Sequence, residues 1–244
     1  MYSALKSIIK SFLPSKFLFK IEPIVRYFHS YLYMGFKYEC NICNFEMSRF
    51  IEDGDHQICA SCGSIGRVRR LWEVVQDEFS NYNQLKILDF SPSRCFYRKL
   101  HNSNSQYFSS DLSGDFIADY QYDITKIDQA NDTFDLIFCY HILEHIEKDT
   151  LAIQELFRIL KQKGTCLIQT PFKTGAIYEN SNITTPEGRL EHFGQADHVR
   201  IYSVEGLKQR LEAVGFTVEI KTYVASENNK NGFNTNETIL FCTK

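Results

Sequence analysis

Four of the eight cysteines stand in two closely spaced pairs, Cys40 with Cys43 and Cys59 with Cys62. Each CxxC turn can direct two thiolates at one ion, and tetrahedral zinc in a structural site takes four such ligands. The spacing therefore predicts a small zinc ribbon. Two disulfides or a redox CxxC are the alternatives. The lack of a signal peptide disfavours disulfides, and the pairing of the motif disfavours a redox site.

A residue suited to a left-handed turn follows each pair, Asn44 after the first and Gly63 after the second, as a zinc knuckle requires. The other cysteines are scattered in apolar stretches, and we expect them in the core. A structural zinc ion with four protein ligands would stabilise the fold, so catalysis has to come from residues further along the chain.

The rest of the chain alternates between strand and helix patterns. We expect strands at residues 85–90, 106–112, 120–124, 133–139 and 165–170, and helices at 94–101 and 147–162, with Gly164 ending the second helix. This order predicts an α/β fold with a parallel sheet. Ser203 is expected to cap a helix that runs to residue 214, before two strands at 216–224 and 238–243 joined by a hydrophilic hairpin. Residues 171–202 show little periodicity, and so long a loop is usually functional.

Charge is unevenly distributed along the chain. Residues 1–72 carry ten Lys and Arg against six Asp and Glu, whereas the whole chain has a formal net charge of −3. The broad basic surface of a dedicated nucleic-acid binder is therefore missing, and any such contact would come from the N-terminal part. Arg67, Arg69 and Arg70 fall on a connecting helix, and we expect them on its solvated face.

We expect three regions: a basic amphipathic segment at 1–38, the zinc ribbon at 39–66 and a catalytic domain at 67–244. The first region has no uncharged run of the roughly 18 residues that a membrane span needs, so we expect a cytoplasmic protein. An amphipathic helix ending near Pro14 would pack on the protein. The alternative is a basic helix lying on an anionic membrane.

Five short segments follow one another as KILDF (86–90), SSDL (109–112), DI (123–124), FDLIFC (134–139) and LEHI (143–146). This succession resembles the class I methyltransferases that use S-adenosylmethionine, over about two thirds of the chain. The knuckle, FSP at 90–92 and FGQADHVRIY at 193–202 resemble more narrowly a bacterial, type 11-like subgroup with an N-terminal four-cysteine zinc ribbon. The resemblance implies a Rossmann-like, seven-stranded, mostly parallel sheet with an antiparallel last strand. The cofactor would lie across the carboxyl ends of the first strands.

The resemblance also assigns cofactor-binding positions. Asp111 would accept hydrogen bonds from the ribose hydroxyls, and Asp123 would lie beside the adenine. An isolated Asp could instead serve a turn or a cap. The complete set of positions is Asp89, Phe90 and Ser91 by the methionine part, Asp111 with Leu112, Asp123 with Ile124, and Cys139 with Tyr140 near the sulfonium. One departure is the turn Phe90-Ser91-Pro92-Ser93, where most members of the family have glycines.

Methyl transfer mainly requires alignment of the nucleophile with the methyl group, and a general base helps when the nucleophile is a hydroxyl. His145 with His198, and also His141, are the candidates, because imidazole titrates near neutral pH. Capping or internal hydrogen bonding are the alternatives. The string HxxEH at 141–145 also occurs in one class of metallopeptidases, but chance matches to so short a motif are expected. Glu144, His145 and His198 could instead hold a divalent ion that orients a sugar diol or an RNA end.

The acidic catalytic half favours a small molecule or a surface-glycan sugar as the acceptor over polyanionic RNA. A zinc-ribbon RNA methyltransferase is the second hypothesis. A non-catalytic binding module with the same fold is the third, and the missing glycines are the feature that raises it.

Overall fold

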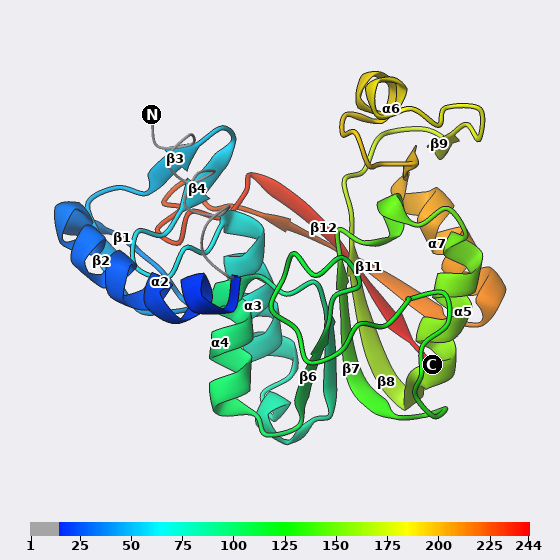
Figure 1. Ribbon diagram of the computed structural model, residues 1–244, viewed down its shortest axis with the longest axis horizontal. Coiled ribbons are helices and arrows are strands. Elements are labelled where there is room, and N and C mark those ends of the chain that lie inside the picture. The colour runs from blue at the N-terminus through cyan, green and yellow to red at the C-terminus, as the bar shows by residue number, and fades with distance from the viewer. Residues whose placement is uncertain (1–14) are drawn as a thin grey trace.

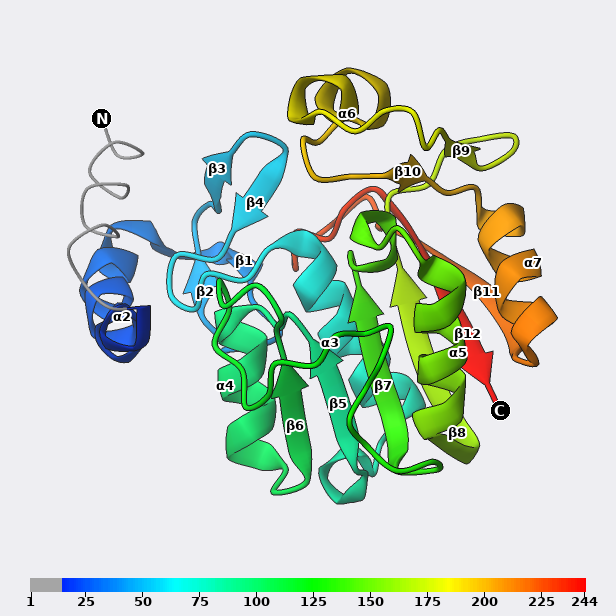
Figure 2. The ribbon, with the colours of Figure 1, turned by 45° about the vertical axis from the view of Figure 1, so that its right-hand side comes forward.

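The structure is a computed structural model that describes residues 15–244. Its centre is a six-stranded sheet in the order β11-β12-β8-β7-β5-β6. The strands are β5 (Ile87–Phe90), β6 (Tyr107–Ser110), β7 (Phe134–Tyr140), β8 (Leu160–Gln169), β11 (Thr217–Val224) and β12 (Asn236–Thr243). Strands β6, β5, β7 and β8 are parallel, and β12 is antiparallel to both of its neighbours (Figure 2). The Rossmann-like α/β fold with an antiparallel last strand is confirmed.

The strand expected at 120–124 is reduced to one parallel bridge between Ser110 and Tyr120, so the sheet has six strands rather than seven. The side chain of Asp123 accepts hydrogen bonds from the backbone N and the hydroxyl of Thr125, at 2.8 and 2.7 Å. Such a local turn competes with the strand ladder for the backbone, which is the physical reason for the difference.

Helices cover both faces of the sheet because the strand residues alternate. Ile87, Leu136 and Phe138 face α3 (Gly66–Glu78) and α4 (Arg94–Ser103), where Trp72 and Phe96 are buried with them. The intervening residues of the same strands form a second apolar cluster with α5 (Asp149–Ile159) and α7 (Val204–Val214). This period of two, with helices on both faces, is what makes the strand segments nearly continuously apolar in sequence.

The helix expected at 147–162 is shorter, and Gly164 does not end it. α5 stops at Ile159, and Gly164 lies inside β8. A Cβ at Gly164 would stand 3.0 Å from the carbonyl oxygen of Asp135 on the neighbouring strand, so glycine is needed for close approach of two strands rather than for a helix cap. Ser203 caps α7 as predicted, since its Oγ accepts the amide of Gly206 at 3.2 Å.

The N-terminal part forms an appendage at one side of the sheet (Figure 1). It consists of α2 (Ser15–Ser30), the 3-10 turn η1 (Tyr31–Tyr33) and two antiparallel strand pairs, β1 (Met34–Glu39) with β2 (Glu46–Met47) and β3 (Ile51–Asp53) with β4 (His56–Ile58). Asn44 and Gly63 have the positive φ predicted for knuckle turns, 57° and 79°. The helix expected to end near Pro14 lies outside the described residues. Within residues 15–244, no helix is both long and apolar enough to cross a bilayer.

Candidate functional site

The carboxyl ends of β5, β6, β7 and β8 meet at one edge of the sheet, below a segment that holds β9 (Tyr178–Glu179), α6 (Pro186–Phe193) and β10 (Arg200–Ile201) (Figure 2). We call this the carboxyl edge; ligands of open parallel sheets bind at such an edge. Two residues there adopt a left-handed conformation, Ser91 after β5 with φ 49° and His141 after β7 with φ 55°. Strained non-glycine residues of this kind cluster at functional sites.

The FSP turn keeps the left-handed backbone that glycine would supply, with Ser91 in that position. Its Oγ donates a hydrogen bond of 2.8 Å to Oδ1 of Asp111. The other oxygen of Asp111 accepts from the hydroxyl of Ser113 at 2.9 Å and from the amide of Gly114 at 2.7 Å. Asp111 is thus buried at the end of β6, where both of its carboxylate oxygens already accept hydrogen bonds from neighbouring loops. A ribose would have to displace these donors.

Asp89 lies beside this turn on the last residues of β5. Its carboxyl is buried and accepts a hydrogen bond of 2.9 Å from the hydroxyl of Tyr107. Burial raises the pKa of Asp89 to about 8, while the Tyr107 hydrogen bond opposes the rise. A cationic group placed here would favour the ionised carboxylate. The side chain therefore suits the positively charged part of a ligand.

The other predicted cofactor positions are more dispersed. Asp123 is exposed, and the hydrogen bonds from Thr125 lower its pKa and occupy it as a turn cap. Ile124, Cys139 and Phe90 are buried in the core, Leu112 is exposed, and Tyr140 is partly exposed at the end of β7. The structure therefore brings Asp89, Ser91 and Asp111 together and leaves Asp123 at a surface turn.

The three predicted histidines and Glu144 form a group that we call the histidine cluster. His145 and Glu144 lie on the 3-10 turn η3 (Leu143–His145), and His198 comes from the segment before β10. The rings of His145 and His198 meet edge to face, with their centroids 4.6 Å apart. His141 Nδ1 is 3.3 Å from Glu144 Oε1, and burial is the main cause that lowers the pKa of His141 and of His198.

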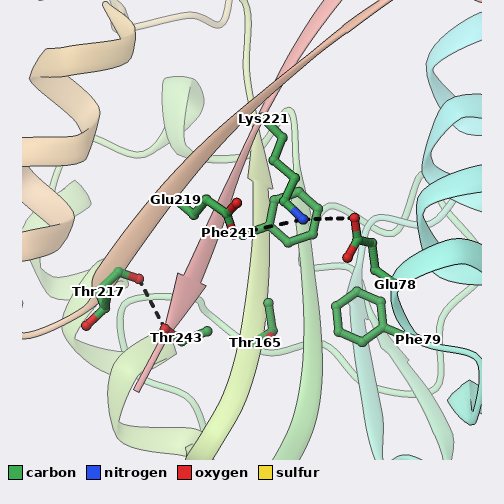
Figure 3. A pocket seen from close by; sticks show the side chains of 8 residues that line it. All are labelled: Glu78, Phe79, Thr165, Thr217, Glu219, Lys221, Phe241 and Thr243. Carbon is green, nitrogen blue, oxygen red and sulfur yellow. Dashed lines mark hydrogen bonds and ion pairs between the residues drawn. The ribbon is translucent and has the colours of Figure 1, made fainter.

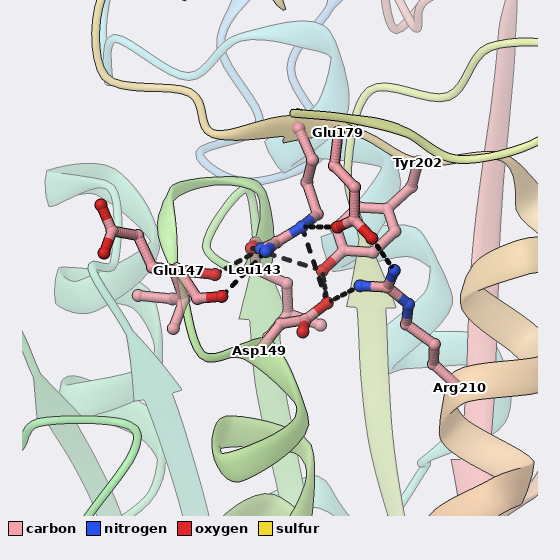
Figure 4. Close-up of polar contacts among 8 residues, drawn as sticks. Leu143, Glu147, Asp149, Glu179, Tyr202 and Arg210 are labelled. Carbon is pink, nitrogen blue, oxygen red and sulfur yellow. Dashed lines mark hydrogen bonds and ion pairs between the residues drawn. The ribbon is translucent and has the colours of Figure 1, made fainter. Parts of the chain in front are cut away.

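Arg200 holds the two halves of this cluster together. Its buried guanidinium donates to the carbonyls of Leu143 at 3.2 Å, Glu147 at 2.9 Å and Ile146, all beside η3, and pairs with Glu179 at 2.9 Å. Figure 4 shows the continuation of this network, in which the Tyr202 hydroxyl donates to Asp149 at 2.6 Å and Arg210 bridges Asp149 and Glu179. Sequence reasoning missed these residues because nothing in their spacing marks them as partners.

Several buried polar atoms at the ends of the strands have no hydrogen-bond partner in the part of the chain that the structure describes. They are Tyr140 Oη, His141 Nε2, both carboxylate oxygens of Glu144, Gln169 Oε1, Thr170 Oγ1, His198 Nε2, Tyr223 Oη and Glu237 Oε2. Burial raises the pKa of Glu237 to about 7, and the carboxylates of Glu144 and Glu237 both act on Arg67. Buried polar groups nearly always have partners, so this concentration indicates a place for ligand or water.

The four knuckle cysteines also lie together. The four sulfur atoms lie within 4.8 Å of one another, with 3.6 Å between those of Cys40 and Cys62 and 3.7 Å between those of Cys43 and Cys59. Four thiolates at about 2.3 Å from one zinc ion form a tetrahedron with edges of about 3.8 Å. The sulfur positions therefore fit one tetrahedral ion.

Arg69 joins the knuckle to the β11–β12 hairpin. The guanidinium is fully buried and donates to the carbonyls of Ser64 at 2.5 Å, Asn231 at 2.5 Å and Gly232 at 2.6 Å. Arg70 is buried as well, against Glu237 and the ring of Phe233. The expectation that Arg69 and Arg70 face solvent is wrong, because they satisfy hairpin carbonyls and a buried carboxylate instead.

A separate depression lies at the opposite end of the sheet, on the surface of β8, β11 and β12 (Figure 3). Lys221 spans it and pairs with Glu78 at 2.8 Å, with the ring of Phe241 below the ammonium group. Its charges are thus already matched. We assign no ligand to it.

Comparison with known proteins agrees with this geometry. A family model described as a methyltransferase domain matches residues 57–220. No curated protein matches the sequence significantly. A methyltransferase from Archaeoglobus fulgidus that depends on S-adenosylmethionine is 14% identical, with a TM-score of 0.51 over 72% of this chain and 93% of that one. A second from Mesorhizobium loti is 15% identical, with a TM-score of 0.52 over 70% and 96%.

A third similar structure is phosphoethanolamine N-methyltransferase 2 of Haemonchus contortus, bound to phosphomonomethylethanolamine and S-adenosylhomocysteine. It is 16% identical, with a TM-score of 0.53 over 72% of this chain and 52% of that one. At these identities the likeness concerns the fold. Together with the family match over most of the chain, it leads to one identification: the chain belongs to the methyltransferase domain family and has the class I fold of methyltransferases that use S-adenosylmethionine.

Proposed function

We propose that this chain transfers a methyl group from S-adenosylmethionine to a hydroxyl or amine of a small molecule or of a surface-glycan sugar. The observation that carries the proposal is the concentration of unpaired buried polar atoms at the carboxyl edge, next to Asp89, Ser91 and Asp111. The cofactor supplies an activated methyl group when bound. Asp111 would hold its ribose hydroxyls, and Asp89 would meet its cationic part.

The chain's own contribution to catalysis is alignment and a proton acceptor. His198 Nε2 and His141 Nε2 are buried ring nitrogens without partners among the described residues, and the ring of His145 meets that of His198 edge to face. These three side chains remain our candidates for the base. Arg200 is a positioning residue, because it fixes the segment that carries His198 to the turn that carries His145.

We propose a structural role for zinc at Cys40, Cys43, Cys59 and Cys62, supported by the sulfur spacing. The ion would hold the end of the ribbon against the β11–β12 hairpin through Arg69. That hairpin leads to Glu237, so the zinc ribbon would stabilise one wall of the acceptor site. We keep the division into regions 1–38, 39–66 and 67–244 as part of this proposal.

The charges favour a compact acceptor. The buried carboxylates Glu144 and Glu237 lie at the site, where both act on Arg67, and their negative charge disfavours a polyanion. The burial of Arg69 and Arg70 also weighs against the RNA alternative, because buried arginines beside the knuckle are not available to contact phosphate.

Transfer of a labelled methyl group to panels of sugar nucleotides, glycan intermediates and RNA tests the proposal. We expect incorporation into a small hydroxyl or amine acceptor and its loss in Asp111→Ala. Asp115→Ala, an exposed neighbour on the same loop, serves as the matched control. Incorporation into RNA alone would establish the alternative substrate, and cofactor binding without transfer to any panel would favour the binding module.

A further inference from the structure

The carboxylate of Glu144 is 1% exposed, and neither of its oxygens has a hydrogen-bond donor within residues 15–244. His141 Nδ1 approaches one oxygen at 3.3 Å without the geometry of a hydrogen bond. A buried ionised carboxylate is costly unless a cation or several donors compensate for it. The other cation facing it is Arg67, which also faces Glu237. Glu144 therefore contacts the imidazole of His141 but accepts no hydrogen bond from the described residues.

Two imidazoles offer the complementary ligands. His145 Nδ1 lies 3.2 Å from Oδ2 of Asp197, and its Nε2 has no hydrogen bond to any residue of 15–244. A carboxylate behind a histidine is the usual arrangement at metal sites, because it fixes the tautomer and the ring orientation. His198 is 3% exposed, and its Nε2 has no partner in the described chain.

The three side chains are close enough for one ion. One ligand atom each from Glu144, His145 and His198 lies within 4.8 Å of the others. Ligands at about 2.1 Å from an ion stand about 3 Å apart when adjacent, so a small closure of the side chains suffices. Two imidazoles and one carboxylate would leave positions on the ion open.

We propose that Glu144, His145 and His198 bind a divalent cation whose open positions take two adjacent oxygens of the acceptor, as in a vicinal diol. The role of the cation in binding the acceptor rests on the proposed function, but the existence of the cation site does not. The site is distinct from the knuckle, whose four ligands are sulfur. A cation at this site restricts the possible acceptors to molecules with two adjacent oxygens that can chelate an ion beside the carboxyl edge.

Manganese distinguishes the two sites, because this hard ion prefers oxygen and nitrogen ligands over thiolates. The purified full chain, with its knuckle metal left in place, is titrated with Mn²⁺, and free Mn²⁺ is followed by electron paramagnetic resonance. We expect one Mn²⁺ per chain and at least a tenfold weaker affinity in Glu144→Gln. Glu147→Gln is the matched control, since that side chain is exposed and pairs with Arg189 on the protein surface.

His198→Ala provides a second variant in case Glu144→Gln fails to fold, and we expect the same loss. The proposal is wrong if the wild type binds no Mn²⁺, or if both folded variants bind it as the wild type does. Calorimetry with S-adenosylmethionine and methyl-transfer assays, each with and without added Mn²⁺ on protein that keeps its knuckle metal, separate the two claims. Methyl transfer that persists unchanged without the second ion would overturn the acceptor role of the cation and leave the proposed function intact.

A different observation supports a second proposal. The segment from α2 to β1 exposes a run of large apolar side chains, among them Phe28 at 67%, Leu32 at 74% and Phe36 at 86%. Lys20 and Lys37 are exposed along the same segment, whereas Glu22, its one acid between residues 17 and 37, pairs with Arg26 and Arg98. The outer face is thus apolar and basic. Aromatic side chains combined with lysines are typical of surfaces that enter the headgroup region of anionic bilayers.

We infer that this face docks on an anionic lipid bilayer. Sedimentation with vesicles of phosphatidylcholine, with and without phosphatidylglycerol, tests the inference. We expect binding only to the anionic vesicles and at least tenfold weaker binding in Leu32→Glu and Phe36→Glu. Leu190→Glu, at an exposed leucine on α6, should bind as the wild type does. Absence of binding to anionic vesicles would overturn the inference, as would a dimer that Leu32→Glu dissociates.

Discussion

Arg69 provides a quantitative test of how the zinc ribbon is joined to the catalytic domain. Its guanidinium donates to four backbone carbonyls, those of Ser64, Asn231, Gly232 and Gln57, at distances from 2.5 to 2.9 Å. Arg69→Met keeps much of the volume and removes every donor. The amide of Cys59 still donates to the carbonyl of Ser64 at 2.9 Å, so only the other three carbonyls are counted. Each buried carbonyl left without a donor costs about 1–3 kcal/mol, so even at the lower limit the loss is about 3 kcal/mol. Whole domains are stable by about 5–15 kcal/mol.

The measurement is urea unfolding, followed by far-UV circular dichroism, together with transfer of zinc to a coloured chelator. We expect Arg69→Met to unfold at much lower urea and to release zinc faster, because the carbonyl of Ser64 belongs to the knuckle turn. Arg49→Met is the control, since Arg49 is exposed and should change stability by less than about 0.5 kcal/mol. If the two variants unfold at the same urea concentration, Arg69 does not join the ribbon to the hairpin.

Three further predictions concern the carboxyl edge. Because burial raises the pKa of Asp89 to about 8, the wild type should lose stability relative to Asp89→Asn by about 1.4 kcal/mol per pH unit between pH 5 and 8; thermal melts with a constant difference would contradict this. Ser91→Ala should be less stable than Ser91→Gly by about 1 kcal/mol. Both variants lose the hydrogen bond to Asp111, but the positive φ at this position is strained for alanine and not for glycine. Equal urea midpoints of the two variants would refute this prediction. Arg200→Lys should increase amide exchange at residues 143–147 at least tenfold by mass spectrometry, and unchanged exchange would exclude its positioning role.

Much of the fold could be predicted from local patterns. The strands and helices around Asp89 and Ser203 follow from apolar runs and capping residues, and they lie close to their expected bounds. The errors occur at residues whose type fits two different structural roles. Gly164 was interpreted as a helix end, but it permits two strands to approach closely. Asp123 was expected inside a strand at 120–124, but its side chain forms a turn with Thr125 that ends the ladder.

The site was partly predictable for the same reason. Cysteine spacing indicates the knuckle, and the order of strand-end residues placed Asp89 and Asp111 at one edge. The contact between His145 and His198 depends on a segment without regular periodicity, which Arg200 anchors through backbone carbonyls. Every residue has a backbone carbonyl, so the sequence does not show which of them accept side-chain hydrogen bonds. The burial of Arg69 was missed because its partners are again carbonyls, and two of them, those of Asn231 and Gly232, lie more than 160 residues further along the chain.

Calorimetry with S-adenosylmethionine on the folded, zinc-loaded chain tests the central claim most directly. Our account predicts saturable binding of one cofactor per chain, at least tenfold weaker in Asp111→Ala and unchanged in Asp115→Ala. Absence of heat at any cofactor concentration with folded protein, confirmed by equilibrium dialysis, would contradict it.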